Sequence, residues 1–261
     1  MNVIKKFVIY IFRVLGYDLI PIGHADHVCL SSFRQKQILS IGSRFSNSNE
    51  NDTDDICQSS KSQLGQDLLA LGMFGPNHRG FFVEFGATDG VEYSNSWLLE
   101  KRFGWTGILA EPGRAWHRDL LKNRSCNIDK RCVYSSSGEE VMFSEVKEAR
   151  ALSTISRFMD VDHHKTRREN QTSYLVPTVS LKDLLDFHKA PRRIDFISID
   201  TEGSEFEILN EFDFNAYSFS LMCVEHNFTD NRIRIHDLLA SHGYKRVYTE
   251  LSEFDDWYVP R

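Results

Sequence analysis

Residues 81–90, FFVEFGATDG, constrain the fold of this chain more than any other stretch. A short apolar run that ends at an acid and continues into glycines is typical of a buried strand followed by a tight turn that faces a ligand. Downstream, apolar runs alternate with helical patterns, which predicts an α/β fold built on a mostly parallel sheet. Residues 81–90 are therefore expected to form the first strand of that sheet and its first ligand-binding loop.

The later apolar runs predict the other strands, and helical patterns lie between most of them. Strands are expected at residues 105–110, 131–134, 141–146, 194–199, 219–224, 244–249 and 253–259, and helices at residues 94–103, 114–123, 179–188, 203–212 and 231–242. The last two predicted strands are separated by only a few residues, which permits an antiparallel hairpin and excludes a helical crossover. A further helix is expected to begin near Gly65, ahead of the first strand.

The first part of the chain differs in character from the rest. Residues 3–15 place apolar side chains at helical spacing with basic residues on the complementary side, which predicts an amphipathic helix. It is too short and too charged to span a membrane, and it can pack on the domain, pair two subunits as a homodimer, or contact a membrane surface. The nearly apolar-free residues 47–61 predict a linker. The expected division is a helical arm at 1–46, a linker at 47–61 and a main domain at 62–261.

Charge and cysteine content narrow the class of partner. The chain has 261 residues and a net charge of −6, whereas domains that neutralise nucleic-acid phosphates usually carry a basic excess. We therefore expect no nucleic-acid partner, and a small molecule or a glycan instead. The five cysteines lack metal-ligand spacing, which favours reduced thiols in a cytoplasmic protein. Membrane association through residues 3–15 stays open.

Acidic residues follow the predicted strands at the points where those strands end. In open α/β sheets, ligands bind beyond the carboxyl ends of the strands. Four predicted strand ends carry acids, namely Glu84 with Asp89, Glu111, Asp200 with Glu202, and Glu225, which His226 follows. One such acid is commonplace, but a set of four predicts a ligand site at this edge of the sheet.

The glycine loop indicates which ligand this site takes. Its spacing is G-x-x-x-G, from Gly86 to Gly90, whereas a dinucleotide fold uses G-x-G-x-x-G to approach a pyrophosphate. Asp89 would also repel phosphate. S-adenosylmethionine carries a sulfonium and an ammonium and no phosphate, so nearby acids favour it. Glu111, at the end of the next predicted strand, is placed to accept both ribose hydroxyls.

Three stretches of this chain resemble one known family. FFVEFGATDGVEYSNSWLLEKRFGWTGILAEP, the upstream SQLGQD, and IDFISIDTEGSEFEIL are similar to the FkbM-type methyltransferases, a branch of the class I S-adenosylmethionine-dependent (Rossmann-like) fold. The resemblance covers roughly residues 62–250. It implies a seven-stranded, mostly parallel sheet of order 3-2-1-4-5-7-6, with helices on both faces and an antiparallel C-terminal hairpin. It also implies O-methylation of sugars, of glycans such as surface polysaccharides, or of natural products.

The resemblance assigns roles to individual residues. It places Glu84, Gly86 and Asp89 beside the methionine part of the cofactor, Glu111 on the ribose, and Asp200, Glu202 and Gly203 at the catalytic edge. The full set of expected cofactor-binding residues is Glu84, Gly86, Ala87, Asp89, Gly90, Asn95, Glu111, Pro112 and Ser135. Where related folds often have an Asp near the adenine, the predicted third strand ends in Tyr134 and Ser135.

Methyl transfer to a hydroxyl needs a base or a metal ion that lowers the hydroxyl pKa. Asp200 and Glu225 end adjacent predicted strands, and with His226 or Asn227 they can hold Mg²⁺. Without a metal the same group can supply a base, and His226 is the obvious one near neutral pH. The catalytic candidates are Asp200, Glu202, Glu225 and His226. The structural alternative is that Asp200 and Glu202 only cap the helix expected at 203–212.

Residues 147–175 are long, charged and poor in secondary-structure patterns, and we interpret them as a substrate-side lid. Their arginines can receive an anionic acceptor. Two other functions share the predicted fold. An NAD-dependent sugar oxidoreductase is disfavoured by the G-x-x-x-G spacing, and a non-catalytic binding module is disfavoured because the strand-end acids are all present.

Overall fold

The computed structural model describes residues 32–42, 50–162 and 164–261, and the chain divides into two compact units. The first unit comprises residues 1–78 and 93–104, and the second comprises residues 79–92 and 105–261. The amphipathic helix predicted at residues 3–15 lies outside the described residues. Among the helices in the described ranges, none has both the length and the apolar character that a membrane crossing requires.

The first unit is helical, and it corrects the expected linker. Its helices are α2 (Ser32–Leu39), α3 (Glu50–Ser59), α4 (Gln66–Phe74) and α5 (Trp97–Phe103). Helix α3 lies within the stretch predicted as a linker, so that prediction is wrong for residues 50–59. Two side chains of α3, Ile56 and Cys57, are buried. Salt bridges of 2.6 Å connect it to α2 through Lys36 and Asp54, and to α5 through Arg102 and Asp55.

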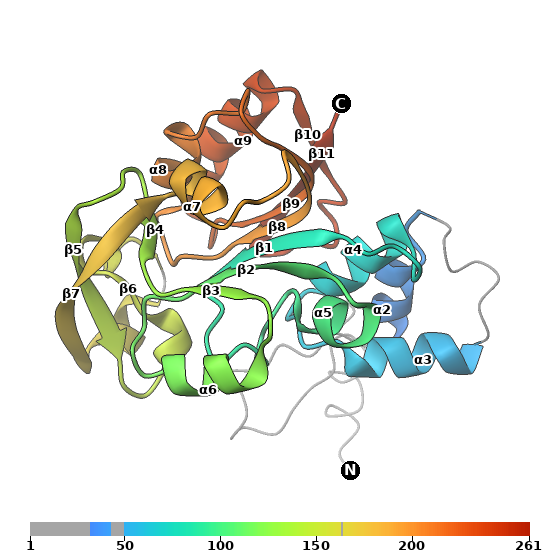
Figure 1. The fold of residues 1–261 in the computed structure, drawn as a ribbon, viewed down its shortest axis with the longest axis horizontal. Coiled ribbons are helices and arrows are strands. Elements are labelled where there is room, and N and C mark those ends of the chain that lie inside the picture. Colours follow the sequence, from blue (N-terminus) through green and yellow to red (C-terminus); the bar gives the residue numbers. More distant parts are fainter. Residues whose placement is uncertain (1–31, 43–49, 163) are drawn as a thin grey trace, which may run out of the picture. The chain divides into compact units, whose positions relative to one another are not determined.

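The second unit contains a seven-stranded sheet of order β10-β11-β9-β8-β1-β2-β3 (Figure 1). Its strands are β1 (Phe81–Phe85), β2 (Thr106–Ala110), β3 (Asn127–Asp129), β8 (Arg193–Ile199), β9 (Ser218–Glu225), β10 (Tyr244–Val247) and β11 (Asp255–Pro260). Strand β11 pairs antiparallel with β9 and β10, and the other neighbours are parallel. The predicted α/β class, strand order and C-terminal hairpin are confirmed.

Three helices pack on one face of this sheet: α7 (Leu181–Phe187), α8 (Glu205–Asn210) and α9 (Asn231–Ser241), drawn in orange to red in Figure 1. Leu184, Leu209 and Leu239 from these helices share a buried cluster with Val83 and Ile197 of the strands. Burial of such aliphatic side chains stabilises the fold by roughly 1.5–3 kcal/mol each. A fourth helix, α6 (His117–Asn123), lies between β2 and β3 in the chain.

A second sheet, of order β4-β7-β5-β6, was not predicted. Its strands are β4 (Cys132–Tyr134), β5 (Glu140–Val146), β6 (Thr154–Ile155) and β7 (Gln171–Ser180), with 3₁₀ turns at Arg150–Leu152, Ser156–Phe158 and Lys165–Arg168. Phe143, Ile155, Phe158 and Val176 form its own small core. We call residues 132–180 the second-sheet segment. Of residues 147–175, those at 154–155 and 171–175 belong to strands of this sheet, and 131–134 is not the third strand of the main sheet.

Candidate active site

The glycine loop and the end of strand β8 are in direct contact. Gly86 follows β1 and has a φ of 71°, in the left-handed region that favours glycine. A Cβ at this position would lie 2.3 Å from the carbonyl oxygen of Asp200, which follows β8. The predicted first ligand loop therefore lies against the first of the predicted catalytic acids.

Glu111 joins the loops that follow the first two strands. Its carboxylate accepts hydrogen bonds from the backbone N–H of Thr88 at 2.8 Å and of Gly113 at 2.7 Å. Burial raises the pKa of Glu111 to about 7, and these two N–H groups act in the opposite direction. Each carboxylate oxygen keeps a second lone pair. Glu111 is thus held in place with acceptor capacity left for two hydroxyls.

Arg124 also holds the glycine loop, and the sequence did not predict it. Its side chain is fully buried, its Nη1 donates to the carbonyl of Gly90 at 3.1 Å, and the same nitrogen lies 3.8 Å from Oε2 of Glu84. The neighbouring Asn123 donates from Nδ2 to the carbonyl of Asp89 at 2.9 Å. The end of α6 therefore fixes the loop, and Glu84 has a cationic partner within the protein.

The other loop residues serve its conformation. Oδ1 of Asp89 accepts the backbone N–H groups of Val91 and Glu92, both at 2.8 Å. Ala87 and Gly90 are buried beside it. Asp89 thus shapes the turn, and its predicted place beside the methionine part of the cofactor stays a prediction.

The third strand of the main sheet ends at Asp129, which corrects the expected end at Tyr134. Residues 132–134 pair instead with β7 of the second sheet, and Ser135 follows them there, half-buried. The Asp129 carboxylate accepts from Nε of Arg131 at 2.9 Å and lies 3.0 Å from Nε2 of His188. An acid does stand at the third strand end, but two side chains of this chain already bind it.

Two further predicted cofactor residues lie in different units. Pro112 is half-buried between Glu111 and Gly113 in the second unit. Asn95 is buried in the first unit. Their contacts with a cofactor stay predictions.

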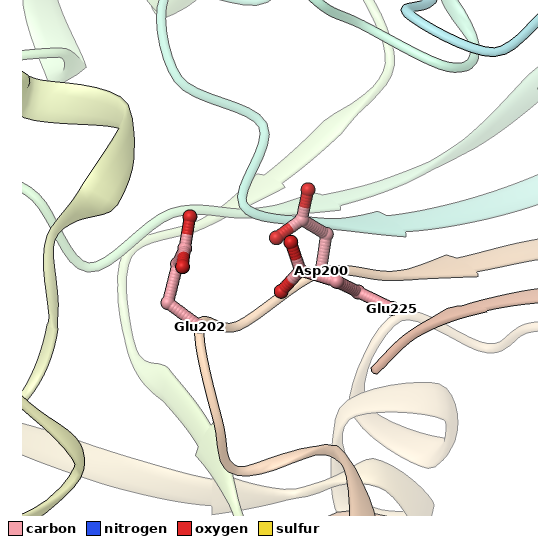
Figure 2. A group of neighbouring side chains, drawn as sticks. All are labelled: Asp200, Glu202 and Glu225. Atoms are coloured by element: carbon pink, nitrogen blue, oxygen red, sulfur yellow. The ribbon is translucent and has the colours of Figure 1, made fainter. Parts of the chain in front are cut away.

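Three carboxylates gather where β8 and β9 end. Oxygen atoms of Asp200, Glu202 and Glu225 all lie within 4.8 Å of one another. Figure 2 shows the carboxyl groups of Asp200 and Glu225 close together, with that of Glu202 beside them. Glu202 has a φ of 58°, an unfavourable conformation for a residue with a Cβ, and such strain is concentrated at functional sites. The structure therefore brings together three of the four predicted catalytic residues.

Burial shapes the protonation of this cluster. It raises the pKa of Asp200 to about 7, and the nearby charge of Glu205 adds to the effect. Burial and the charge of Asp200 also raise the pKa values of Glu202 and Glu225. The charge of Arg168 acts against the rise in pKa for Asp200 and Glu202. A carboxyl group that titrates near neutral pH suits proton transfer.

The N-cap position of α8 is Ser204, with no side-chain cap, so neither Asp200 nor Glu202 occupies the capping position. Oε1 of Glu205, in the first turn of α8, accepts from the backbone N–H of Thr201 at 2.9 Å and of Gly203 at 3.0 Å. These bonds fix the turn that leads into the helix. Asp200 and Glu202 lie beside Glu225, and Glu202 also accepts from Arg168 Nη2 at 2.6 Å.

His226 is not part of the cluster, which corrects its predicted role as base and metal ligand. Its Nδ1 accepts the backbone N–H of Phe228 at 3.0 Å, so Nε2 carries the proton and donates to the carbonyl of Asp255 at 3.0 Å. Burial lowers the pKa of His226 to about 4, which keeps the ring neutral. Neither ring nitrogen has a free lone pair. Glu202 takes the third place that was expected for the histidine.

Comparison with known proteins identifies a family whose model matches this chain. The model of the methyltransferase FkbM domain matches residues 84–254. The chain is similar to the solved structure of methyltransferase FkbM from Methylobacillus flagellatus KT, at 11% identity over 87% of this chain and 58% of that chain, with a TM-score of 0.43. It is similar to precorrin-6y C5,15-methyltransferase from Geobacter metallireducens GS-15, at 13% identity over 77% of this chain and 89% of that chain, with a TM-score of 0.39. No curated protein matches it.

The matched region begins at Glu84 and includes the glycine loop, Glu111 and all three clustered carboxylates. It covers more than half of the chain. The chain therefore belongs to the methyltransferase FkbM domain family.

Proposed function

We propose that this methyltransferase takes its methyl group from S-adenosylmethionine and transfers it to a hydroxyl of a sugar, a glycan or a natural product. The observation that carries the proposal is the contact between the glycine loop and the carboxylate cluster, in which Gly86 lies against Asp200. A donor bound on the loop and an acceptor bound at the cluster would be adjacent. Such positioning accounts for much of the catalysis of an in-line displacement.

The donor side suits a cation better than a pyrophosphate. The loop lacks the middle glycine of a dinucleotide fold, and Glu84, Glu111 and Asp200 all lie at this edge of the sheet. Acids attract the sulfonium and ammonium groups of S-adenosylmethionine and repel phosphate. This charge distribution favours a methyl donor over NAD.

The acceptor side has a carboxyl group placed for proton transfer. In the proposed step, the acceptor oxygen attacks the methyl carbon and its proton passes to the carboxylate of Asp200. The bond between the methyl carbon and sulfur breaks, and its electron pair stays on sulfur to give neutral S-adenosylhomocysteine. An oxygen of Glu225 lies within 4.8 Å of one of Asp200, so Glu225 lies beside that carboxylate.

The charge balance favours an uncharged acceptor hydroxyl over an anionic one. The expectation of an anion rested on the arginines of residues 147–175. Arg168 is bound to two carboxylates, Asp162 and Glu202. Arg157 lies over the rings of Tyr134 and Phe158, at 4.8 and 4.6 Å from their centroids. A phosphorylated or acidic sugar would therefore meet a group of carboxylates.

Cofactor binding gives the first test. S-adenosylhomocysteine is expected to raise the melting temperature of the protein, and NAD is not. The E111Q variant is expected to bind S-adenosylhomocysteine about 10-fold more weakly or worse, because an amide NH₂ would face one of the two backbone N–H donors. The exposed E140Q variant is the control. Stabilisation by NAD alone would overturn the proposal in favour of an oxidoreductase.

Mg²⁺ is the second candidate for activating the hydroxyl. The oxygen-rich set of Asp200, Glu202 and Glu225 fits a hard cation and would hold it, and the ion would lower the hydroxyl pKa. One ligand, Glu202, is however already bound by Arg168 at 2.6 Å. We therefore favour Asp200 as the base.

Chelation separates these two mechanisms. If Asp200 is the base, dialysis against EDTA is expected to leave kcat within about 2-fold, because proton transfer to a carboxylate needs no metal ion. The measurement is donor turnover in a panel of neutral methyl glycosides, before and after chelation and with Mg²⁺ added back. A loss that Mg²⁺ restores would assign hydroxyl activation to the ion.

A further inference from the structure

Arg168 is a buried side chain beside the carboxylate cluster with five hydrogen bonds, and the proposed chemistry does not use it. Its guanidinium is fully buried. Nη1 and Nη2 donate to the two oxygens of Asp162 at 2.8 and 2.9 Å, a bidentate geometry, and Nη2 also donates to Oε2 of Glu202 at 2.6 Å. Nε donates to the carbonyl of Leu152 at 2.9 Å. Charge-assisted bonds of this kind are the strongest hydrogen bonds in proteins.

These contacts connect two parts of the molecule. Asp162 and Leu152 belong to the second-sheet segment, whereas Glu202 lies in the turn after β8. Other contacts follow the same path. Thr154 Oγ1 donates to the carbonyls of Thr201 and Glu202 at 3.2 and 3.0 Å. The second-sheet segment thus lies against the turn that carries Glu202, and Arg168 donates to the carboxylate of Glu202.

Glu202 needs such a partner. Its backbone is strained, its side chain is buried, and oxygens of Asp200 and Glu225 lie within 4.8 Å of it. Asn227 Nδ2 adds only a long contact of 3.4 Å to the same oxygen, Oε2. Without the guanidinium, the Glu202 carboxyl group could turn towards Asp200 and occupy the position that the acceptor hydroxyl needs.

We propose that Arg168 is a positioning residue for methyl transfer: it holds Glu202 beside the Asp200–Glu225 pair and thereby couples the second-sheet segment to the acceptor side of the site. The proposal rests on the proposed methyltransferase chemistry. It assigns Arg168 no contact with the donor or the acceptor. Its effect is carried by the orientation of Glu202.

The test compares R168K, which keeps the positive charge but cannot make the bidentate hydrogen bonds of a guanidinium, with E202Q and with the double variant. R167K, a change at the exposed neighbour, is the matched control. R168K is expected to lower kcat for donor turnover with neutral methyl glycosides by about 10-fold, while S-adenosylhomocysteine affinity stays within about 2-fold. The double variant is expected to be no slower than E202Q, because both changes act on one carboxylate.

Hydrogen exchange gives an independent measure that needs no substrate. Amide exchange of residues 152–168 is expected to accelerate in R168K and in E202Q, but not in R167K. Unchanged exchange in both variants would overturn the proposal, as would a kcat for R168K close to that of the wild type. Additive losses in the double variant would reduce Arg168 to a structural role. Failure of the wild type to bind S-adenosylhomocysteine would count against the proposed function instead, and the exchange experiment would still test the contact.

Discussion

The D200N variant is expected to lose about 100- to 10,000-fold in kcat for methyl transfer, because it removes the proposed general base. Its affinity for S-adenosylhomocysteine is expected to change little. The wild-type kcat is expected to rise with pH through about 7, since Asp200 holds a proton below its raised pKa and accepts one only above it. This limb of the pH–rate profile is expected to disappear in D200N.

Melting temperature separates this loss from misfolding. Burial of Asp200 disfavours its ionised form, so a neutral asparagine is not expected to lower the melting temperature at pH 8. The control is D237N, the same substitution at an exposed position of α9. A D200N enzyme that keeps kcat within about 10-fold of the wild type would show that another group takes the proton.

The G86A variant is expected to destabilise the protein by several kcal/mol, roughly 3 or more. An L-residue at a φ of 71° costs about 1–2 kcal/mol, and its Cβ would lie 2.3 Å from the carbonyl oxygen of Asp200. The resulting overlap must push the end of β1 away from the end of β8. Because each kcal/mol shifts the melting temperature of a protein of this size by about 2–4 °C, the expected decrease is about 6 °C or more.

A second glycine separates the two causes. Gly138 has a φ of 81°, but a Cβ there would meet nothing within 4 Å. G138A therefore carries the conformational cost alone and is expected to lower the melting temperature by only a few degrees. Affinity for S-adenosylhomocysteine is expected to fall in G86A and not in G138A. Equal shifts in melting temperature would show that the contact with Asp200 is unimportant.

The central strands of the main sheet could be predicted because they are short, mostly buried apolar runs, whereas the polar β3 (Asn127–Asp129) was missed. Strands at 81–85, 106–110, 193–199 and 218–225 lie close to their predicted ranges. The order of the sheet followed from the family resemblance, and the short joint near residue 250 predicted its antiparallel end. These features depend on local composition and on chain length between elements, both of which a single sequence contains.

The second sheet could not be predicted because its longest strand is mostly polar. Strand β7, QTSYLVPTVS, begins with three exposed polar residues and contains Pro177. A proline usually argues against a central strand because it cannot donate a backbone hydrogen bond. It is tolerated here because β4 pairs only with residues from Thr178 onward. Strand β7 is stabilised by pairing with β4 and β5, which are distant from it in the sequence. The local pattern of residues in β7 does not indicate this pairing.

The candidate site was predictable in its strand-end acids and not in their partners. Asp200 and Glu225 come together because adjacent parallel strands end at the same edge of the sheet. Glu202 and His226 lie in turns. In a turn the side chains do not alternate regularly as they do in a strand, so the sequence does not show which way each one points. Arg124 and Arg168 reach the acids from segments that lie 40 and 34 residues away in sequence, that is 124 − 84 and 202 − 168. Only the three-dimensional structure shows such pairs.

The two halves of the proposed site are anchored differently. Glu111 and Arg124 fasten the donor loop to the main sheet through backbone groups, so most substitutions elsewhere leave it intact. The second-sheet segment, in contrast, meets the Glu202 turn through side chains, among them Thr154, Arg168 and Phe158. In the proposed enzyme the donor side is thus fixed by the main sheet, whereas the geometry of the acceptor side depends on how this segment packs on the Glu202 turn.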